Sequence, residues 1–189
     1  SDKIDDSVAS VAAIAPGVMG ITGIETAEIL KGIIERIKPD AVIAIDALVA
    51  RRTSRINSVI QIADSGISPG SGVGNKRMLL NEESLGVPVI GIGVPTVVSA
   101  ATLVNDSMER ILSAMAEASE EKLFYNTLNN LGDEREALIA ELLEPYAENM
   151  FVTPKEVDEV IERLAEIISN AINIAVHPAL TKEDINKYV

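Results

Sequence analysis

The 189-residue chain contains no cysteine and no tryptophan, and only 3% of its residues are aromatic. The absence of cysteine excludes disulfide bonds and thiolate chemistry. Because aromatic residues are so few, a core must consist mainly of aliphatic side chains. The hydrophobic fraction of 47% argues against disorder, and this length predicts one domain with a core of ordinary size.

Positive charge is also scarce: 16 lysine and arginine residues stand against 29 aspartate and glutamate residues, so the net charge is −13. A nucleic-acid-binding surface needs a basic patch, and we therefore expect no nucleic-acid partner. The apolar runs are too short to span a bilayer, and the first residues do not resemble a signal peptide. We expect no membrane partner and a cytoplasmic protein.

The chain has a single histidine, His177, which argues against two kinds of site. A metal centre needs more ligands than one histidine, and a Ser-His-Asp triad built on this residue is unconvincing. We interpret His177 as structural, and we expect neither a bound metal nor another cofactor.

Alternating strand-like and helix-like segments predict an α/β fold. Short apolar runs predict strands at residues 8–15, 41–45, 58–63 and 87–92. Apolar residues at helical spacing, and Thr-x-x-Glu capping boxes at Thr22 and Thr153, predict helices at residues 22–37, 97–115, 135–143 and 153–172. We expect a three-layer α/β/α architecture with a mainly parallel sheet. Residues 1–189 should form a single domain, with the polar stretch 117–136 as the one flexible link within it.

Two of the predicted strands end on a carboxylate, at Asp46 and at Asp64. Open α/β sheets build their sites at the carboxyl ends of such strands. Asp46 is either a catalytic acid or a structural residue that caps a turn, and the residues alone favour neither. If the two strands are parallel neighbours about 5 Å apart, Asp64 can act as a second carboxylate or bind substrate. An Asx-turn at Asp64 is the favoured interpretation.

A glycine-rich loop follows Asp64 and contains Gly70, Gly72, Gly74 and Asn75. Glycine permits close backbone approach, so the loop can line a cleft and offer its backbone groups to an extended peptide. It can instead hold a phosphate, but no Gly-Lys-Ser/Thr sequence follows, and the P-loop interpretation is weak.

Three arginines, Arg51, Arg52 and Arg55, follow the strand that carries Asp46. A guanidinium group can bind a substrate carboxylate through two parallel hydrogen bonds. Exposed ion pairs are the favoured interpretation of these side chains, and substrate binding by Arg51 is the alternative.

Five segments closely resemble the germination protease family of spore-forming bacteria, in order along nearly the whole chain. They are residues 15–26 (APGVMGITGIET), 45–51 (IDALVAR), 69–77 (PGSGVGNKR), 93–98 (GVPTVV) and 152–158 (VTPKEVD). The resemblance implies an atypical aspartic endopeptidase of the spore core that degrades small acid-soluble spore proteins during germination. It also implies a self-processing zymogen, a tetramer, and a fold similar to that of hydrogenase-maturation proteases.

The resemblance assigns one of the family's two catalytic aspartates to Asp46. The other belongs to an upstream motif, Gly-Asn followed later by Thr-Pro-Asp, that this sequence does not contain. The family's portion before Val8 is missing, the link near residues 117–124 is shorter, and Ser99 stands where the family has Asp. We therefore expect this chain by itself to be inactive. The alternative is a non-catalytic scaffold or a domain that binds a small ligand such as phosphate or a nucleoside.

Overall fold

The computed structural model describes residues 9–74, 77–118, 132–147 and 150–183. The chain divides into two compact units. The larger comprises Val18–Pro154, and the smaller comprises Ser1–Gly17 together with Lys155–Val189. The smaller unit contains the helix α7, Val157–Val176. Within the described part of the chain, no helix combines the length and the apolar character needed to cross a membrane. The prediction of a single domain stays a prediction.

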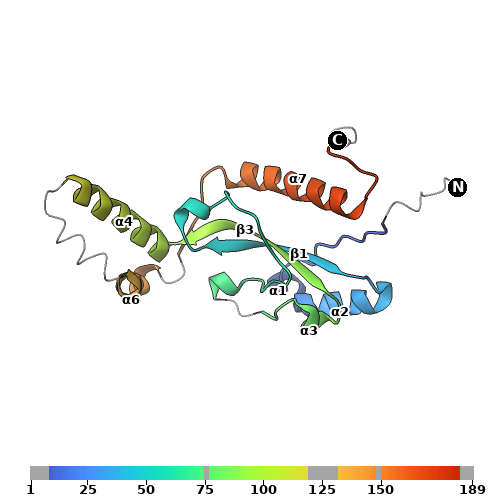
Figure 1. Ribbon diagram of the computed structural model, residues 1–189. Helices are drawn as coiled ribbons and strands as arrows, with labels where there is room; N and C mark the ends of the chain where they lie inside the picture. Colours follow the sequence, from blue (N-terminus) through green and yellow to red (C-terminus); the bar gives the residue numbers. More distant parts are fainter. Residues whose placement is uncertain (1–8, 75–76, 119–131, 148–149, 184–189) are drawn as a thin grey trace. The chain divides into compact units, whose positions relative to one another are not determined.

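The larger unit is built on a mixed open sheet (Figure 1). Its central strand is β3, Val89–Ser99, which pairs in parallel with β1, Val42–Ala50. On its other side β3 pairs antiparallel with β2, Gln61–Ala63, and with β4, Phe151–Val152. The α/β class is confirmed. The described strands form one parallel and two antiparallel pairs, whereas a mainly parallel sheet was predicted.

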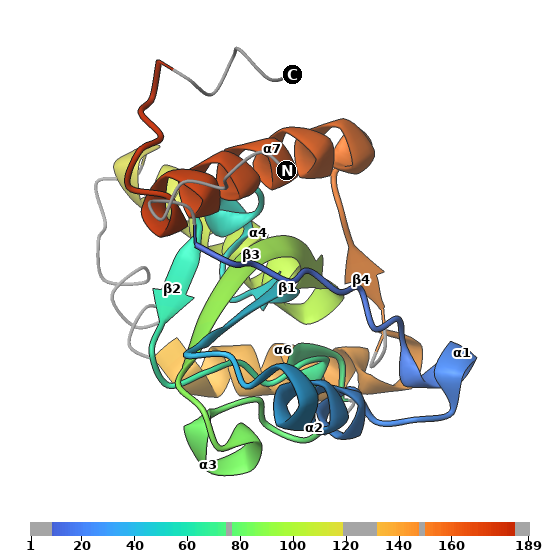
Figure 2. The ribbon, with the colours of Figure 1, turned by 90° about the vertical axis from the view of Figure 1, so that its right-hand side faces the viewer.

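Helices and short turns connect these strands. They are α1 (Met19–Thr22), α2 (Thr26–Ile37), η1 (Thr53–Arg55), η2 (Ser71–Val73), α3 (Glu82–Leu85), α4 (Ala100–Ala118) and α6 (Gly132–Ala147). Figure 2 shows α2 and α3 side by side on one side of β1 and β3. The predicted helix 135–143 is longer at both ends and continues past Pro145. Most of the predicted link 117–136 lies outside the described residues.

The core of the larger unit lies between α2, α3 and one face of β1 and β3. It consists of buried aliphatic residues, with further half-buried ones packed against them: Ala27, Ile67, Leu80, Leu85 and Val89, then Leu30, Ile34, Val42, Ala44, Leu48 and Val87. Side chains alternate between the two faces of a strand. Val42, Ala44 and Leu48 therefore define the covered face of β1, and Asp46 belongs to the same face.

A β-bulge explains why β3 is seven residues longer at its end than the predicted strand 87–92. Its register with β1 shifts between Leu48, opposite Pro95, and Val49, opposite Val97, so Thr96 has no partner on β1. Proline is tolerated inside a sheet at a bulge. The Pro95 carbonyl accepts the N–H of Asn57 at 2.7 Å. The Thr153 hydroxyl donates to the Thr96 carbonyl at 2.8 Å, which fixes the bulge from a second side.

Both predicted capping boxes are wrong. α1 ends at Thr22, whose hydroxyl accepts the N–H of Ile24, and α2 begins only at Thr26. Thr153 bonds to β3 and α7 begins at Val157. A capping box does form between Asn81 and Ser84 at the start of α3. Sequence reasoning missed it because the third residue of this helix is a serine, whereas the usual signature has glutamate or glutamine there.

The predicted strand 8–15 is not formed in its described part, where residues 9–18 have no regular secondary structure. A strand needs a neighbour to satisfy its backbone groups, and no described strand pairs with this segment. Of the predicted elements in residues 8–45, the helix and the second strand form, as α2 and β1.

Candidate active site

Asp46 lies in the middle of β1, four residues after its first residue and four before its last. The prediction that the strand ends at this carboxylate is wrong, because β3 continues beyond it and pairs with β1 as far as Ala50. Asp46 is half-buried, and no described residue donates a hydrogen bond to its carboxylate. The structure therefore leaves this acid available for a partner that the described chain does not provide.

The strand next to Asp46 carries two buried glycines. Asp46 is in register with Gly93 of β3, and Gly91 lies two residues earlier on the same face. A Cβ atom at Gly93 would lie 2.3 Å from Cδ1 of Leu48, and one at Gly91 would lie 2.6 Å from the carbonyl oxygen of Gly66. These glycines let Leu48 and the start of the glycine-rich loop approach β3 closely.

The glycine-rich loop is closed at its base and lies against β1. Ile67 and Leu80 exchange two backbone hydrogen bonds, of 3.0 Å and 2.9 Å, which form the neck of the loop. A Cβ at Gly72 would lie 2.6 Å from Cγ2 of Val49, three residues beyond Asp46 on β1. The structure thus brings the loop to the strand of Asp46. Gly70 and Gly74 have left-handed backbone conformations, and Asn75 lies outside the described residues.

Asp64 is not a neighbour of Asp46. It follows Ala63 of β2, which pairs antiparallel with β3 on the side opposite to β1. Ala63 is level with Gly91, whereas Asp46 is level with Gly93. Two strand spacings and about three residues of rise separate the two aspartates by roughly 14 Å. The predicted adjacency of their strands is wrong, because β3 lies between them, and Asp64 is exposed.

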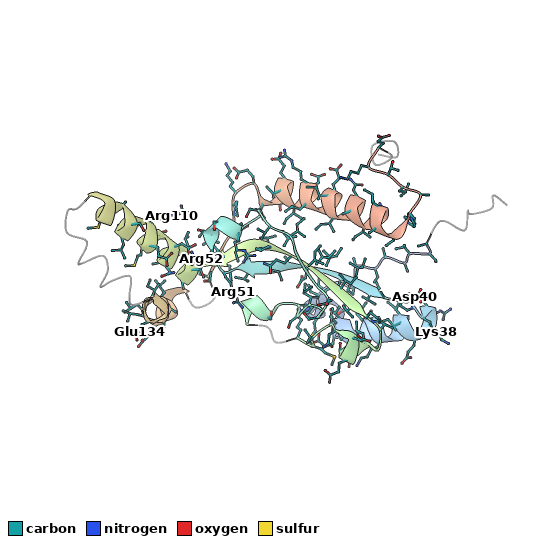
Figure 3. The ribbon with its side chains drawn as sticks, viewed as in Figure 1. Lys38, Asp40, Arg51, Arg52, Arg110 and Glu134 are labelled. Carbon is teal, nitrogen blue, oxygen red and sulfur yellow. The ribbon has the colours of Figure 1, made fainter. Side chains whose placement is uncertain are left out.

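The arginines follow β1 at η1, which Asp106 of α4 holds in place. The Asp106 carboxylate accepts the Thr53 N–H at 2.7 Å and the Thr53 hydroxyl at 2.8 Å. Arg52 forms an ion pair with Glu109 at 3.8 Å, as the interpretation of exposed ion pairs predicts. Figure 3 shows Arg52 and Arg110 at η1 and α4, where they border an open hollow of about 420 Å³ that does not include Asp46. Arg51 is exposed.

The two hydrogen bonds of Asp106 give a first prediction. Asp106→Ala should lower the free energy of unfolding by about 1–3 kcal/mol, because hydrogen bonds to a charged group are lost and the Thr53 N–H is left without its partner. Urea denaturation followed by circular dichroism measures this change. The control is Asp40→Ala, which also removes one negative charge but from an exposed side chain without a hydrogen bond to a described residue. Equal effects of the two substitutions would contradict the prediction.

Glu25 connects the start of α2 to the end of the glycine-rich loop, and sequence reasoning missed this contact. Its Oε1 accepts the N–H of Met78 at 3.3 Å, and its Oε2 is buried without a partner among the residues that the structure describes. The predicted capping role is wrong, since Glu25 precedes α2 but makes no side-chain cap. No local spacing signals a contact between positions 53 residues apart.

Ser99 has a local structural role. Its hydroxyl accepts the N–H of Thr102 at 3.1 Å, one residue before α4 begins at Ala100. Serine and aspartate are both favoured N-cap residues, so Ser99 preserves the cap that an aspartate would form at this position.

Metal-binding residues do not cluster in the described chain. No three histidine, cysteine, aspartate or glutamate side chains there are arranged to hold a metal ion. His177 follows α7, and its backbone N–H donates to the backbone carbonyl of Asn173 at 3.0 Å.

Comparison with known proteins gives consistent matches. The sequence model of the germination protease family matches residues 1–128 and 114–189 of this chain. The germination protease of Clostridium perfringens (strain 13 / Type A) is 56% identical over 190 residues, which cover 100% of this chain and 58% of that protein. The germination protease of Clostridium tetani is 54% identical over 190 residues, with 100% and 59% covered. That of Bacillus subtilis (strain 168) is 42% identical over 219 residues, with 99% and 60% covered. The chain thus spans about three fifths of the length of these relatives.

Proposed function

We propose, because this chain belongs to the germination protease family, that the protein is an endopeptidase that degrades small acid-soluble spore proteins during spore germination. The family match covers the chain from end to end and supports protease activity. The substrates follow from the same family membership, and the spore core is the expected compartment.

The proposed chemistry is the attack of water on a peptide carbonyl between two carboxyl groups. One carboxylate accepts a proton from the water, while the other carboxyl is protonated and donates a hydrogen bond to the carbonyl oxygen. Asp46 is the proposed member of this pair in the chain. The observation that carries the proposal is its half-buried carboxylate, which receives no hydrogen bond from a described residue and lies on β1 level with Gly93 of β3. This chemistry requires neither a metal nor an organic cofactor.

The second carboxylate is proposed to come from polypeptide that the longer relatives have in addition. The sheet order argues against Asp64 as this partner, because two carboxyl groups that share a proton must be in contact. Asp64 stays a candidate substrate-binding residue, together with Arg51 and the loop residues Gly70, Gly72, Gly74 and Asn75. The position of the loop against Val49 supports a role in holding an extended peptide near Asp46.

The proposal extends to architecture and assembly. We infer that the complete protein has a three-layer α/β/α fold similar to that of hydrogenase-maturation proteases, and that it forms a homo-oligomer, with a tetramer expected from the family. The mixed sheet with a central β3 is compatible with this fold.

The alternative of a phosphate-binding domain has less support. Phosphate loops place the anion at the N-terminus of a helix that follows the glycines. Here the loop closes at the Ile67–Leu80 neck before α3 begins at Glu82, and the first turn of α3 carries the acidic residues Glu82 and Glu83. Negative side chains at this helix start would repel a phosphate.

A chimera tests the proposed activity. The 189 residues of this chain replace the aligned segment of the C. perfringens relative, and mass spectrometry follows cleavage of a small acid-soluble spore protein. We expect specific cleavage by the chimera and no detectable cleavage by the isolated chain. An inactive chimera, when the intact relative is active, would contradict the proposed function. Rapid turnover by the isolated chain would instead show that the chain already contains both carboxylates.

A further inference from the structure

One edge of the sheet beside Asp46 is open. β1 pairs with β3 on one side, and no described strand pairs with its other side. β1 is nine residues long, so this edge presents a row of backbone donors and acceptors without strand partners.

The backbone groups at the open edge can be assigned by residue. The N–H of Val42 donates to the carbonyl of Pro88 at 2.9 Å and therefore points towards β3. Backbone groups alternate in direction along a strand, so those of Asp46 also point towards β3, whereas those of Ile43, Ile45 and Ala47 point outward. Two of the three outward-facing residues flank Asp46 directly.

This edge lacks most of the features that protect exposed strands from pairing, and its one charged side chain is that of Asp46, on the covered face. Its sequence from Val42 to Ala50 contains no lysine and no proline, and the described register disruption lies only near its end, at Leu48 and Val49. Ile43 and Ile45 expose 36% and 54% of their surface. A long and mostly apolar edge is a site for another strand and a liability if left open.

We propose that this edge binds a β-strand from the additional polypeptide of the longer protein. The relatives provide the argument for this occupant, because the aligned segment covers only 58% of the C. perfringens protein, which leaves more than a third of its length to supply a strand. Pairing would satisfy the outward groups of Ile43, Ile45 and Ala47 and extend the sheet past β1. This pairing is independent of whether the protein is catalytic.

The position of the added strand has a consequence that rests on the proposed function. Neighbouring strands lie about 5 Å apart, so side chains of the added strand on the face of Asp46 come within reach of its carboxylate. The strand would thus complete the site next to Asp46 from outside the 189 residues.

Amide hydrogen exchange tests the proposal on the chain as it exists. The probe is the part of the C. perfringens relative that lies outside the aligned segment, made as a separate polypeptide. We expect it to slow the exchange of the Ile43, Ile45 and Ala47 amides at least tenfold, with little change at Ala44, whose amide already faces β3. Ile45→Pro removes an outward N–H and should weaken binding of the probe at least tenfold, whereas Ile45→Ala keeps that N–H and should bind nearly as well as the unchanged chain.

A second measurement covers the case in which the separate polypeptide does not fold. In the intact C. perfringens relative, the amides aligned with Ile43, Ile45 and Ala47 should be as protected as those facing β3. Rapid exchange there would overturn the proposal. Protection that appears only with a spore-protein peptide would also overturn it, because the edge would then bind substrate. Protection that rises with the concentration of the 189-residue chain alone would overturn it as well, because the edge would then bind a second copy of the chain. A protected edge in a protein without proteolytic activity would refute the proposed function and leave the pairing intact.

Discussion

Replacement of Asp46 by asparagine in the chimera is expected to lower the rate of spore-protein cleavage by about 10²–10⁴-fold, the typical contribution of a general acid or base. Asparagine matches aspartate in size but can neither accept the proton of the attacking water nor share a proton with a second carboxyl. Because Asp46 has no hydrogen bond to a described residue, the substitution breaks no known contact and should leave the fold unchanged.

The loss of activity must be separated from the loss of a charge. Asp40→Asn removes the same charge from an exposed side chain just before β1 and should leave cleavage within about twofold, because exposed charges act weakly in water. Cleavage rates under saturating substrate, with circular dichroism as the check on folding, provide the comparison. An Asp46→Asn chimera that still cleaves at more than a tenth of the unchanged rate would remove Asp46 from the proposed mechanism.

The sequence predicts those parts of the site whose signal is local. Of the predicted strand 41–45, residues 42–45 lie in β1, and Asp46 lies on the same strand. The glycines after Asp64 form an irregular loop that approaches β1. In each case the signal is a run of apolar residues or of glycines, and local backbone preference decides the outcome. The α/β class follows from the alternation of such runs.

The order of the strands was not predictable in this way. β2 follows β1 in the sequence, yet β3 lies between them, and this order separates Asp64 from Asp46. Periodicity reports which residues are buried, whereas the pairing of strands depends on contacts between residues far apart in the chain. The extension of β3 was missed for a related reason, because Pro95 argues against a central strand unless the bulge is known.

The same limit applies to the glycines. The sequence shows a glycine at positions 66, 91 and 93 but cannot tell which other residues each of them touches. The structure separates them, since Gly91 and Gly66 meet each other and Gly93 meets Leu48. Close packing between the neck of the loop and β3 is thus a property of paired positions 25 residues apart, and it makes a stability prediction possible.

Gly66→Ala is expected to lower the free energy of unfolding by about 2–5 kcal/mol, through two effects that add. Its φ of +85° lies in the left-handed region, which a residue with a Cβ adopts at a cost of about 1–2 kcal/mol. The new Cβ would also lie 2.0 Å from the Leu80 carbonyl oxygen, and overpacking of this kind typically adds about 1–3 kcal/mol. Urea denaturation of the 189-residue chain measures the sum.

Gly86→Ala separates the two effects, because Gly86 has a φ of +74° but no atom within 4 Å of its Cβ position. It should lose only the conformational part, about 1–2 kcal/mol. The excess at Gly66 then reports the packing of the loop neck on Leu80, and faster exchange of the Ile67 and Leu80 amides should accompany it. If both substitutions destabilise the chain equally, the neck has room for a methyl group. The contact between Gly66 and Leu80 would then not hold the glycine-rich loop against β1. A role of the loop beside Asp46 would require other contacts to position it.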